Sequence, residues 1–198
     1  GGAYVVARDG SFHYFINHYV PGAGFGGWTV LGGNFATEPT IARAADGVVY
    51  LVGRSSAGVV ASGRYVPGSG FQGWYSAPGS PLATGKPALT IGSDGAAYVA
   101  IRSLTGNNIW MARLEGDVWG PWIYGGGTAK TDPELAATGG MIYAAVTNIW
   151  DTVYVQGFQE GTGNGWQGSW QPLSGVPLKK ASIAASGGRY FIAGKSSA

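Results

Sequence analysis

The chain of 198 residues lacks cysteine altogether and has only two histidines. Without thiols it can form neither a disulfide framework nor a thiolate zinc site. The histidines, His13 and His18, lie five residues apart in a strand-like segment, so they point to opposite faces and make a poor metal pair. We therefore expect no metal and no cofactor.

Charge is also scarce, at 11% of residues, with a formal net charge of +2. No basic cluster exceeds the pair Lys179-Lys180, which argues against a nucleic-acid partner. No apolar run approaches the roughly 18 residues of a membrane span, so we expect no membrane insertion. The uncharged, aromatic-rich composition favours an extracellular or cell-surface location.

Glycine and aromatic residues are abundant, with 37 Gly and 8 Trp, and they recur at a fixed period. Tryptophans that close each unit are spaced by 46, 48 and 48 residues, and tyrosines in central strand-like runs and prolines that open the units repeat alongside them. The tryptophans are Trp28, Trp74, Trp122 and Trp170; the tyrosines are Tyr4, Tyr50, Tyr98, Tyr143 and Tyr190; the opening positions are Pro39, Pro87, Pro133 and Ala181. Such a period predicts a propeller-like array.

One complete unit, residues 38–79, contains four short strand-like runs separated by Gly turns, and no segment shows the 3.6-residue apolar period of a helix. The sequence thus predicts an all-β protein, a β-propeller of four-stranded repeats of about 46–48 residues with almost no helix. We expect one domain, 1–198, with units of approximately 1–33, 34–79, 80–127, 128–175 and a partial 176–198.

The ends of the chain decide the predicted number of blades. The sequence starts at a central strand, Ala3–Arg8, and stops just past another, Arg189–Ala193. If N- and C-terminal strands share one blade, the ring closes without free sheet edges. This favours four blades, with five as the other option, and leaves one central strand surplus.

The pattern of the units resembles the repeats of bacterial fucose-binding β-propeller lectins, and more loosely tectonin-like repeats. The third unit carries the resemblance best, through Trp119-Gly-Pro-Trp122, Gly126-Gly127, Pro133, Gly139-Gly140 and Tyr143. The resemblance covers the whole chain through turn and core residues, and it implies the propeller fold and a fucose-type monosaccharide or glycoconjugate as ligand.

Candidate ligand-binding residues fall into two groups. Tryptophans outside the repeat, which could stack on sugar rings, are Trp110, Trp119, Trp150 and Trp166. Of these, Trp150 and Trp166 are expected in loops that flank strand ends. Arginines four residues after the central tyrosine, which could grip hydroxyls or a carboxylate, are Arg8, Arg54 and Arg102. The alternative for these arginines is a structural hydrogen bond to the next blade, and the repeated closing tryptophans are expected to pack between blades.

Carboxylates argue against an enzyme at this level. Asp9, Asp46 and Asp94 belong to Asp-Gly turns and have a structural role there. Glu38 and Glu134 each lie beside an opening strand, so these two could still form the pair of carboxylates that glycoside hydrolysis needs. The sequence therefore predicts a non-catalytic, lectin-like protein with several shallow glycan sites between blades. The alternatives are a protein-interaction scaffold or adhesin domain and a glycoside hydrolase, and homo-oligomerisation is a further option.

Overall fold

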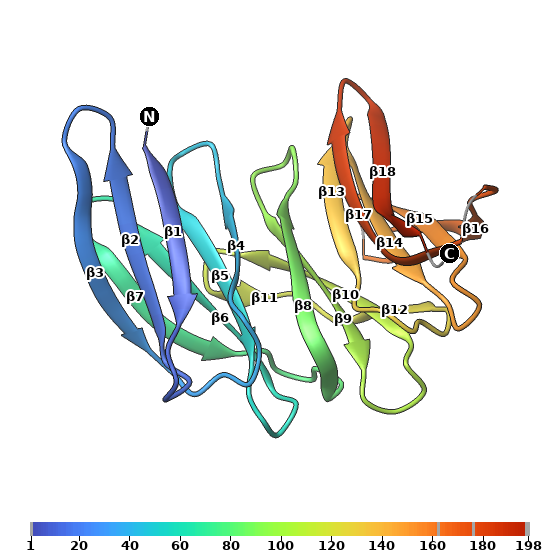
Figure 1. Cartoon of the computed structure of the whole chain (residues 1–198), viewed down its shortest axis with the longest axis horizontal. Coiled ribbons are helices and arrows are strands. Elements are labelled where there is room, and N and C mark those ends of the chain that lie inside the picture. The colour runs from blue at the N-terminus through green and yellow to red at the C-terminus, as the bar shows by residue number, and fades with distance from the viewer. Residues whose placement is uncertain (1, 162, 176, 197–198) are drawn as a thin grey trace.

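The computed structural model describes residues 2–161, 163–175 and 177–196, which form 18 β-strands and no helix (Figure 1). The prediction of an all-β chain is confirmed for these residues. Because this part of the chain is free of helices, it also contains no helix able to cross a bilayer.

The strands assemble into five antiparallel sheets, each built from consecutive segments of the chain. In sheet order the strands are β1 (Ala3–Arg8), β2 (Tyr14–Val20) and β3 (Gly24–Gly32); β4 (Thr40–Arg43), β5 (Val49–Arg54), β6 (Val60–Val66) and β7 (Gly70–Ser76); β8 (Ala83–Ile91), β9 (Ala97–Ser103), β10 (Ile109–Glu115), β11 (Val118–Trp119) and β12 (Ile123–Gly126); β13 (Glu134–Thr138), β14 (Met141–Thr147), β15 (Val153–Gln159) and β16 (Trp166–Pro172); and β17 (Leu178–Ser186) and β18 (Arg189–Ser196).

Turn chemistry explains where the first two strands of each unit meet. In the second sheet the Asp46 Oδ1 accepts a hydrogen bond from the Val48 N–H (3.0 Å), and Gly47 adopts a φ of +92°. Asp can bond its own turn backbone, and Gly tolerates a left-handed conformation, so this dipeptide reverses the chain between β4 and β5. The predicted Asp-Gly turn is confirmed at this position.

Each sheet packs its face on the next, and the central strands of the second, third and fourth sheets, β5, β9 and β14, are largely buried. In β5, Leu51 packs toward the first sheet in a cluster with Tyr14, whereas Val52 packs toward the third sheet in a cluster with Ile101. Neighbouring residues of one strand thus point into two different cores, which explains why these strands are apolar at consecutive positions.

The outermost strand of the third sheet is interrupted. Its two pieces, β11 and β12, both pair with β10, and the segment between them contains Pro121. Proline lacks the N–H that a ladder requires, so the strand breaks there. Two short strands therefore stand in place of one continuous closing strand.

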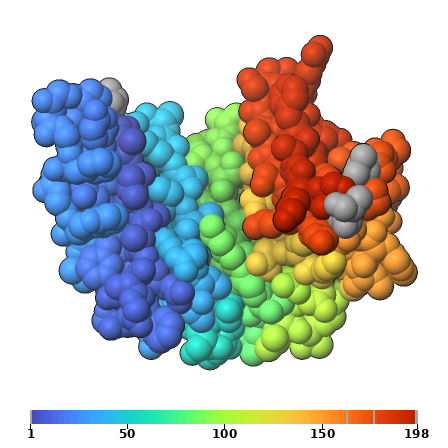
Figure 2. Space-filling model, viewed as in Figure 1, coloured from blue at the N-terminus to red at the C-terminus, as the bar shows by residue number. Residues whose placement is uncertain are grey.

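The predicted closure of a ring by N- and C-terminal strands is wrong for the described part of the chain. Strand β1 pairs only with β2, and β17 and β18 form their own two-stranded sheet against β13 and β14. Figure 1 shows the first and last sheets at opposite ends of the long axis, and Figure 2 shows a hollow between them. The succession of sheets does not bend far enough to bring the terminal strands into hydrogen-bonding distance.

The last sheet also corrects the repeat alignment. The Tyr190 ring packs back on Tyr143 of the fourth sheet at 4.8 Å, whereas Phe191 points away and is 60% exposed. Phe191 follows its Gly-Gly turn by three residues, as Tyr143 does, so it and not Tyr190 occupies the central aromatic position. Counting from the turn gives the correct face, because strand side chains alternate.

Candidate functional site

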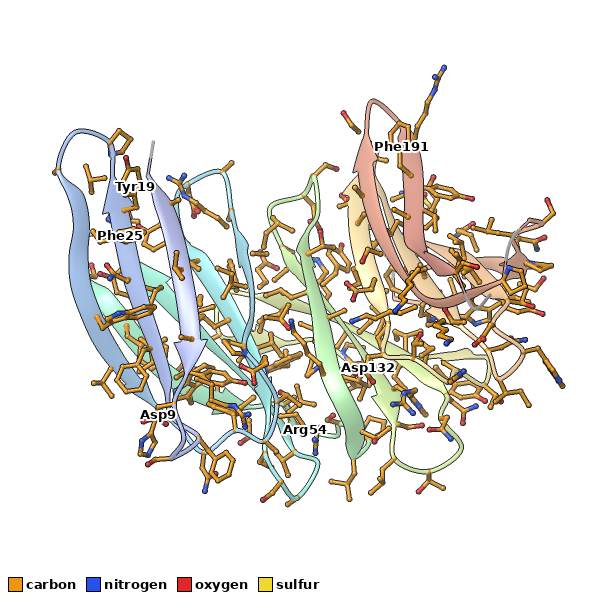
Figure 3. All side chains as sticks on the ribbon, viewed as in Figure 1. Asp9, Tyr19, Phe25, Arg54, Asp132 and Phe191 are labelled. Carbon is orange, nitrogen blue, oxygen red and sulfur yellow. The ribbon has the colours of Figure 1, made fainter. Side chains whose placement is uncertain are left out.

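The three strand-end arginines lie at one edge of the sheets, each bonded to the segment that opens the next sheet. Arg8 donates to the Phe35 carbonyl oxygen and to Glu38, both at 3.0 Å. Arg54 donates from Nε to the Gly85 carbonyl oxygen (2.8 Å). Figure 3 shows Arg54 and Asp132 at this edge. These contacts correspond to the alternative given above for these arginines, a structural hydrogen bond to the next sheet.

Arg102 makes the most extensive of these contacts. Its Nε and Nη2 donate to Asp132 at 3.3 and 3.0 Å, and its Nη1 donates to the Asn107 side chain at 2.7 Å. Asp132 also accepts a hydrogen bond from the Lys86 N–H (2.9 Å), so its carboxylate fastens three segments together.

Three of the four closing tryptophans, Trp74, Trp122 and Trp170, pack between sheets as the repeat predicts. Trp74 donates from Nε1 to the Leu31 carbonyl oxygen of the preceding sheet (2.8 Å), and Trp170 donates to the Gly125 carbonyl oxygen (2.9 Å). Trp28 occupies the same position in the first sheet and is 53% exposed, because no sheet of the described chain precedes it. Trp122 is half-buried against the core between the second and third sheets.

The four non-repeated tryptophans have different surroundings. Trp110 packs edge-on against Tyr124, and Trp119 stacks on Trp122 with ring centroids 5.5 Å apart. Trp166, expected in a loop, begins β16 and packs edge-on against Phe158 in the core. Trp150 alone among the four is strongly exposed, at 74%.

A narrow pocket, called the inner pocket below, lies among β4, β8, β13 and β17. These four strands open the second to fifth sheets and are called the inner strands. Asp132 and Glu134 line this pocket of about 70 Å³, together with Lys180, whose Nζ lies 3.5 Å from Glu134. Glu38 bonds to Arg8 instead and does not line this pocket. The predicted pair of Glu38 and Glu134 is not brought together here.

A larger cleft of about 420 Å³ opens between the third and fourth sheets. Glu115 at the end of β10 and Trp119 on β11 line it, the hairpin after β15 contributes Gly161, and Arg113 lies on β10 facing the opening. An aromatic wall beside charged groups is an arrangement that suits a carbohydrate, whose C–H faces stack while its hydroxyls form hydrogen bonds.

Arg113 links two carboxylates at this cleft. Its Nε donates to Asp94 Oδ2 (3.0 Å) and its Nη1 donates to Glu115 Oε2 (2.7 Å). Glu115 is 73% exposed and Asp94 retains 24% exposure of its side chain, so solvent or a ligand can reach both. The two carboxylates are therefore separated by one guanidinium group and two hydrogen bonds. In glycoside hydrolases the distance between the two catalytic carboxyl groups is roughly 5–9.5 Å, which is on the same scale.

A second layer of hydrogen bonds holds Asp94 in place. Tyr98 donates its hydroxyl hydrogen to Asp94 Oδ2 (2.8 Å) and accepts from the Gly161 N–H (2.8 Å). Glu160 Oε2 accepts from the Ser93 hydroxyl (2.6 Å) and from the Asp94 N–H (3.2 Å). The turn before β9 and the hairpin after β15 are thereby joined across the cleft.

These contacts shift the titration of the site. Burial disfavours the ionised form of Asp94, but hydrogen bonds from Tyr98, the Ala96 N–H and Arg113 outweigh it and lower the pKa of this carboxyl. The carboxylate of Glu115, with that of Asp94, raises the pKa of Arg113. Burial raises the pKa of Tyr98. Such a concentration of shifted groups in a cleft is typical of functional sites.

Sequence reasoning identified only Trp119 among these residues. Asp94 was assigned to its turn alone, although its Oδ1 forms the turn hydrogen bond while its Oδ2 binds Tyr98 and Arg113. The available signal was Arg113 two residues before Glu115, which places both side chains on one face at a strand end. The contribution of the hairpin after β15 depends on packing between sheets. No cluster of three or more potential metal ligands occurs among residues that the structure describes.

No protein-family model matches the sequence, and no curated protein is significantly similar to it. Solved structures do share its fold. AofleA from Arthrobotrys oligospora is 11% identical with a TM-score of 0.63, and the alignment covers 91% of this chain and 56% of that one. A triple arginine-to-alanine mutant of AofleA aligns over 100% of this chain, with 12% identity and a TM-score of 0.59. The two alignments cover 56% and 66% of AofleA, so this chain spans less than two thirds of its length.

Two glycoside hydrolases also share the fold. The GH43_1 enzyme from Xanthomonas citri, complexed with xylotriose, is 14% identical with a TM-score of 0.50, covering 97% of this chain and 77% of the enzyme. The exo-beta-1,3-galactanase from Phanerochaete chrysosporium, with beta-1,3-galactotriose, is 15% identical with a TM-score of 0.50, covering 91% of this chain and 55% of the enzyme. At these identities the likeness shows the fold alone.

The predictions of a non-catalytic lectin and of a protein without enzymatic activity are contradicted by these comparisons. The fold is shared with glycoside hydrolases. The SapL1 lectin in complex with alpha methyl fucoside is a weaker match, with a TM-score of 0.32. The sequence-based case against an enzyme assumed that its acids stay apart, whereas folding joins Asp94 and Glu115 through one arginine.

Proposed function

We propose that this protein acts on glycans as a glycoside hydrolase, at the cleft between the third and fourth sheets. The observation that carries the proposal is the pair Asp94 and Glu115, both bonded to Arg113. Arg113, Glu115 and Trp119 line a cleft of about 420 Å³, and Asp94 adjoins it through Arg113. Glycoside hydrolysis needs two carboxyl groups near the scissile bond, and an aromatic wall orients the sugar.

The environments of the two carboxyl groups suggest how the roles divide. Asp94 is held in its ionised form by three donors, which suits a base or a charge that stabilises an oxocarbenium-like transition state. Glu115 is exposed at the cleft and is the group placed to exchange a proton with the glycosidic oxygen. Arg113 keeps both in position.

The sheets are proposed to be blades of a β-propeller, whose number of blades remains a prediction. An extracellular or cell-surface location follows from composition alone and is part of the same proposal. The glycan is proposed as the general ligand class because neighbours of this fold were solved with xylotriose and galactotriose.

The test is a hydrolysis assay with xylotriose, beta-1,3-galactotriose and a panel of aryl glycosides, with products separated by chromatography. Glu115→Gln and Asp94→Asn should each lower the rate by at least about a hundredfold, as for loss of an acid–base group. Glu134→Gln, which changes a carboxylate of the inner pocket, is the matched control and should keep the rate.

Two results would count against this proposal. A well-folded wild-type chain that releases no product from any substrate would exclude hydrolysis on this panel. Activity lost in Glu134→Gln but kept in Glu115→Gln would place the reaction at the inner strands instead.

A further inference from the structure

A second pocket, of about 450 Å³, lies at the other end of the contact between the third and fourth sheets. The turn between β14 and β15 supplies Asn148, Ile149 and Trp150; Tyr154 and Trp170 form the wall; and Thr128 lies on the segment that follows β12. Tyr154 and Phe158, which lines the first cleft, are four residues apart on β15, or about 13 Å along the strand. The two pockets are therefore distinct.

The turn that presents Trp150 is fixed by its own hydrogen bonds. Asn148 Oδ1 accepts from the Trp150 N–H (2.9 Å) and from the Thr152 N–H (3.0 Å). Asp151 adopts a left-handed φ of +60° and pairs with Lys130, Nζ to Oδ1 at 2.7 Å. A residue other than glycine keeps this strained backbone conformation only when contacts with the surrounding structure stabilise it. The indole is thus presented by a rigid turn.

This rigid turn displays apolar surface to solvent. Ile149 and Trp150 are neighbours and both are strongly exposed, whereas Trp110 and Trp166 are packed between sheets. Exposed, adjacent apolar side chains beside a preformed pocket mark a binding site more often than a structural element. Both side chains are therefore accessible to a ligand.

The lining indicates a neutral ligand with a ring. None of the eight lining residues is charged, and the polar groups are the Asn148 amide, the Thr128 hydroxyl and the Tyr154 hydroxyl. We propose that this pocket is a second glycan-binding site, in which one pyranose ring stacks on Trp150 and its hydroxyls bond to these groups. The choice of a glycan as ligand rests on the proposed function; the site itself rests on the geometry of the turn.

The test uses the Glu115→Gln variant of the full chain, so that a sugar is not consumed during titration. Xylotriose, beta-1,3-galactotriose and methyl alpha-fucoside are titrated separately by calorimetry. Adding Trp150→Ala should weaken the binding of at least one of these sugars by about fivefold or more, a factor typical of a lost ring contact. Adding Trp28→Ala, which removes an exposed tryptophan from the first sheet, is the matched control and should leave affinity unchanged.

The proposal is overturned if none of the three sugars binds at millimolar concentration, if Trp150→Ala has no effect, or if Trp28→Ala weakens binding equally. Hydrolysis by the otherwise unchanged chain is measured separately. A chain that hydrolyses nothing yet loses sugar affinity with Trp150 would contradict the proposed function and support this second site.

Discussion

At the scale of single residues, Asp94 combines a structural and a chemical contact in one side chain. Its Oδ1 accepts the turn hydrogen bond from the Ala96 N–H, and its Oδ2 accepts from Tyr98 and Arg113. Asp94→Asn keeps the shape of the side chain but removes the charge, and should lower the free energy of unfolding by about 1–3 kcal/mol. Urea denaturation at neutral pH measures this loss.

The same carboxyl predicts how the stability of the fold changes with pH. Folding lowers its pKa below the ordinary value of 3.8, so its ionised form contributes stability above that pH, and the contribution disappears as the pH falls below 3.8 and through the folded-state pKa. Asp94→Asn should therefore flatten this acid limb. Urea denaturation across the acid range measures the limb, and an equally steep limb in Asp94→Asn would contradict this assignment.

At the scale of the elements, the closing tryptophans allow a comparison within one chain. Trp74 fills the core between the first two sheets and bonds to the Leu31 carbonyl oxygen, whereas Trp28 holds the same repeat position with its ring largely in solvent. Trp74→Ala should destabilise the chain by about 3–5 kcal/mol, the cost of emptying an aromatic core position. Trp28→Ala should change stability by less than about 0.5 kcal/mol. Equal effects in thermal or urea unfolding would contradict the packing scheme.

Strands and turns are the part of this fold that the sequence predicts best. The predicted central strand Ala3–Arg8 coincides with β1, and the other central strands differ by a few residues at their ends. Local signals suffice there because Asp-Gly and Gly-Gly turns fix where a hairpin reverses. Trp166 was misplaced in a loop because its burial depends on Phe158 and on the neighbouring sheet, which local pattern does not encode.

At the scale of the whole molecule, neither the arrangement of the sheets nor the candidate site could be predicted from the sequence. The closed ring was inferred by counting strands, but the curvature between packed sheets is set by side-chain volumes in several interfaces. The cleft likewise combines Asp94, Arg113 and Gly161, which lie 19 to 67 residues apart and meet only when the third and fourth sheets pack. Motif spacing within one unit cannot show such a site.

Sheets that contact only their neighbours should differ in stability along the chain, because the inner ones have two packed faces and the outer ones have one. The third sheet is the extreme case: Val99 and Ile101 of β9, and Met111 and Leu114 of β10, have no exposed surface. In the last sheet Phe191 lies largely in solvent (Figure 3).

Hydrogen exchange measured by mass spectrometry should therefore find the slowest amides in β9 and β10 and faster exchange in β18 and in the outer strand β3. Uniform protection across all sheets would mean that the chain opens as one cooperative unit, and the nearest-neighbour account would then be wrong. The slow amides also flank Arg113 and Glu115, so the proposed catalytic groups would lie on the most stable part of the molecule, as a preorganised site requires.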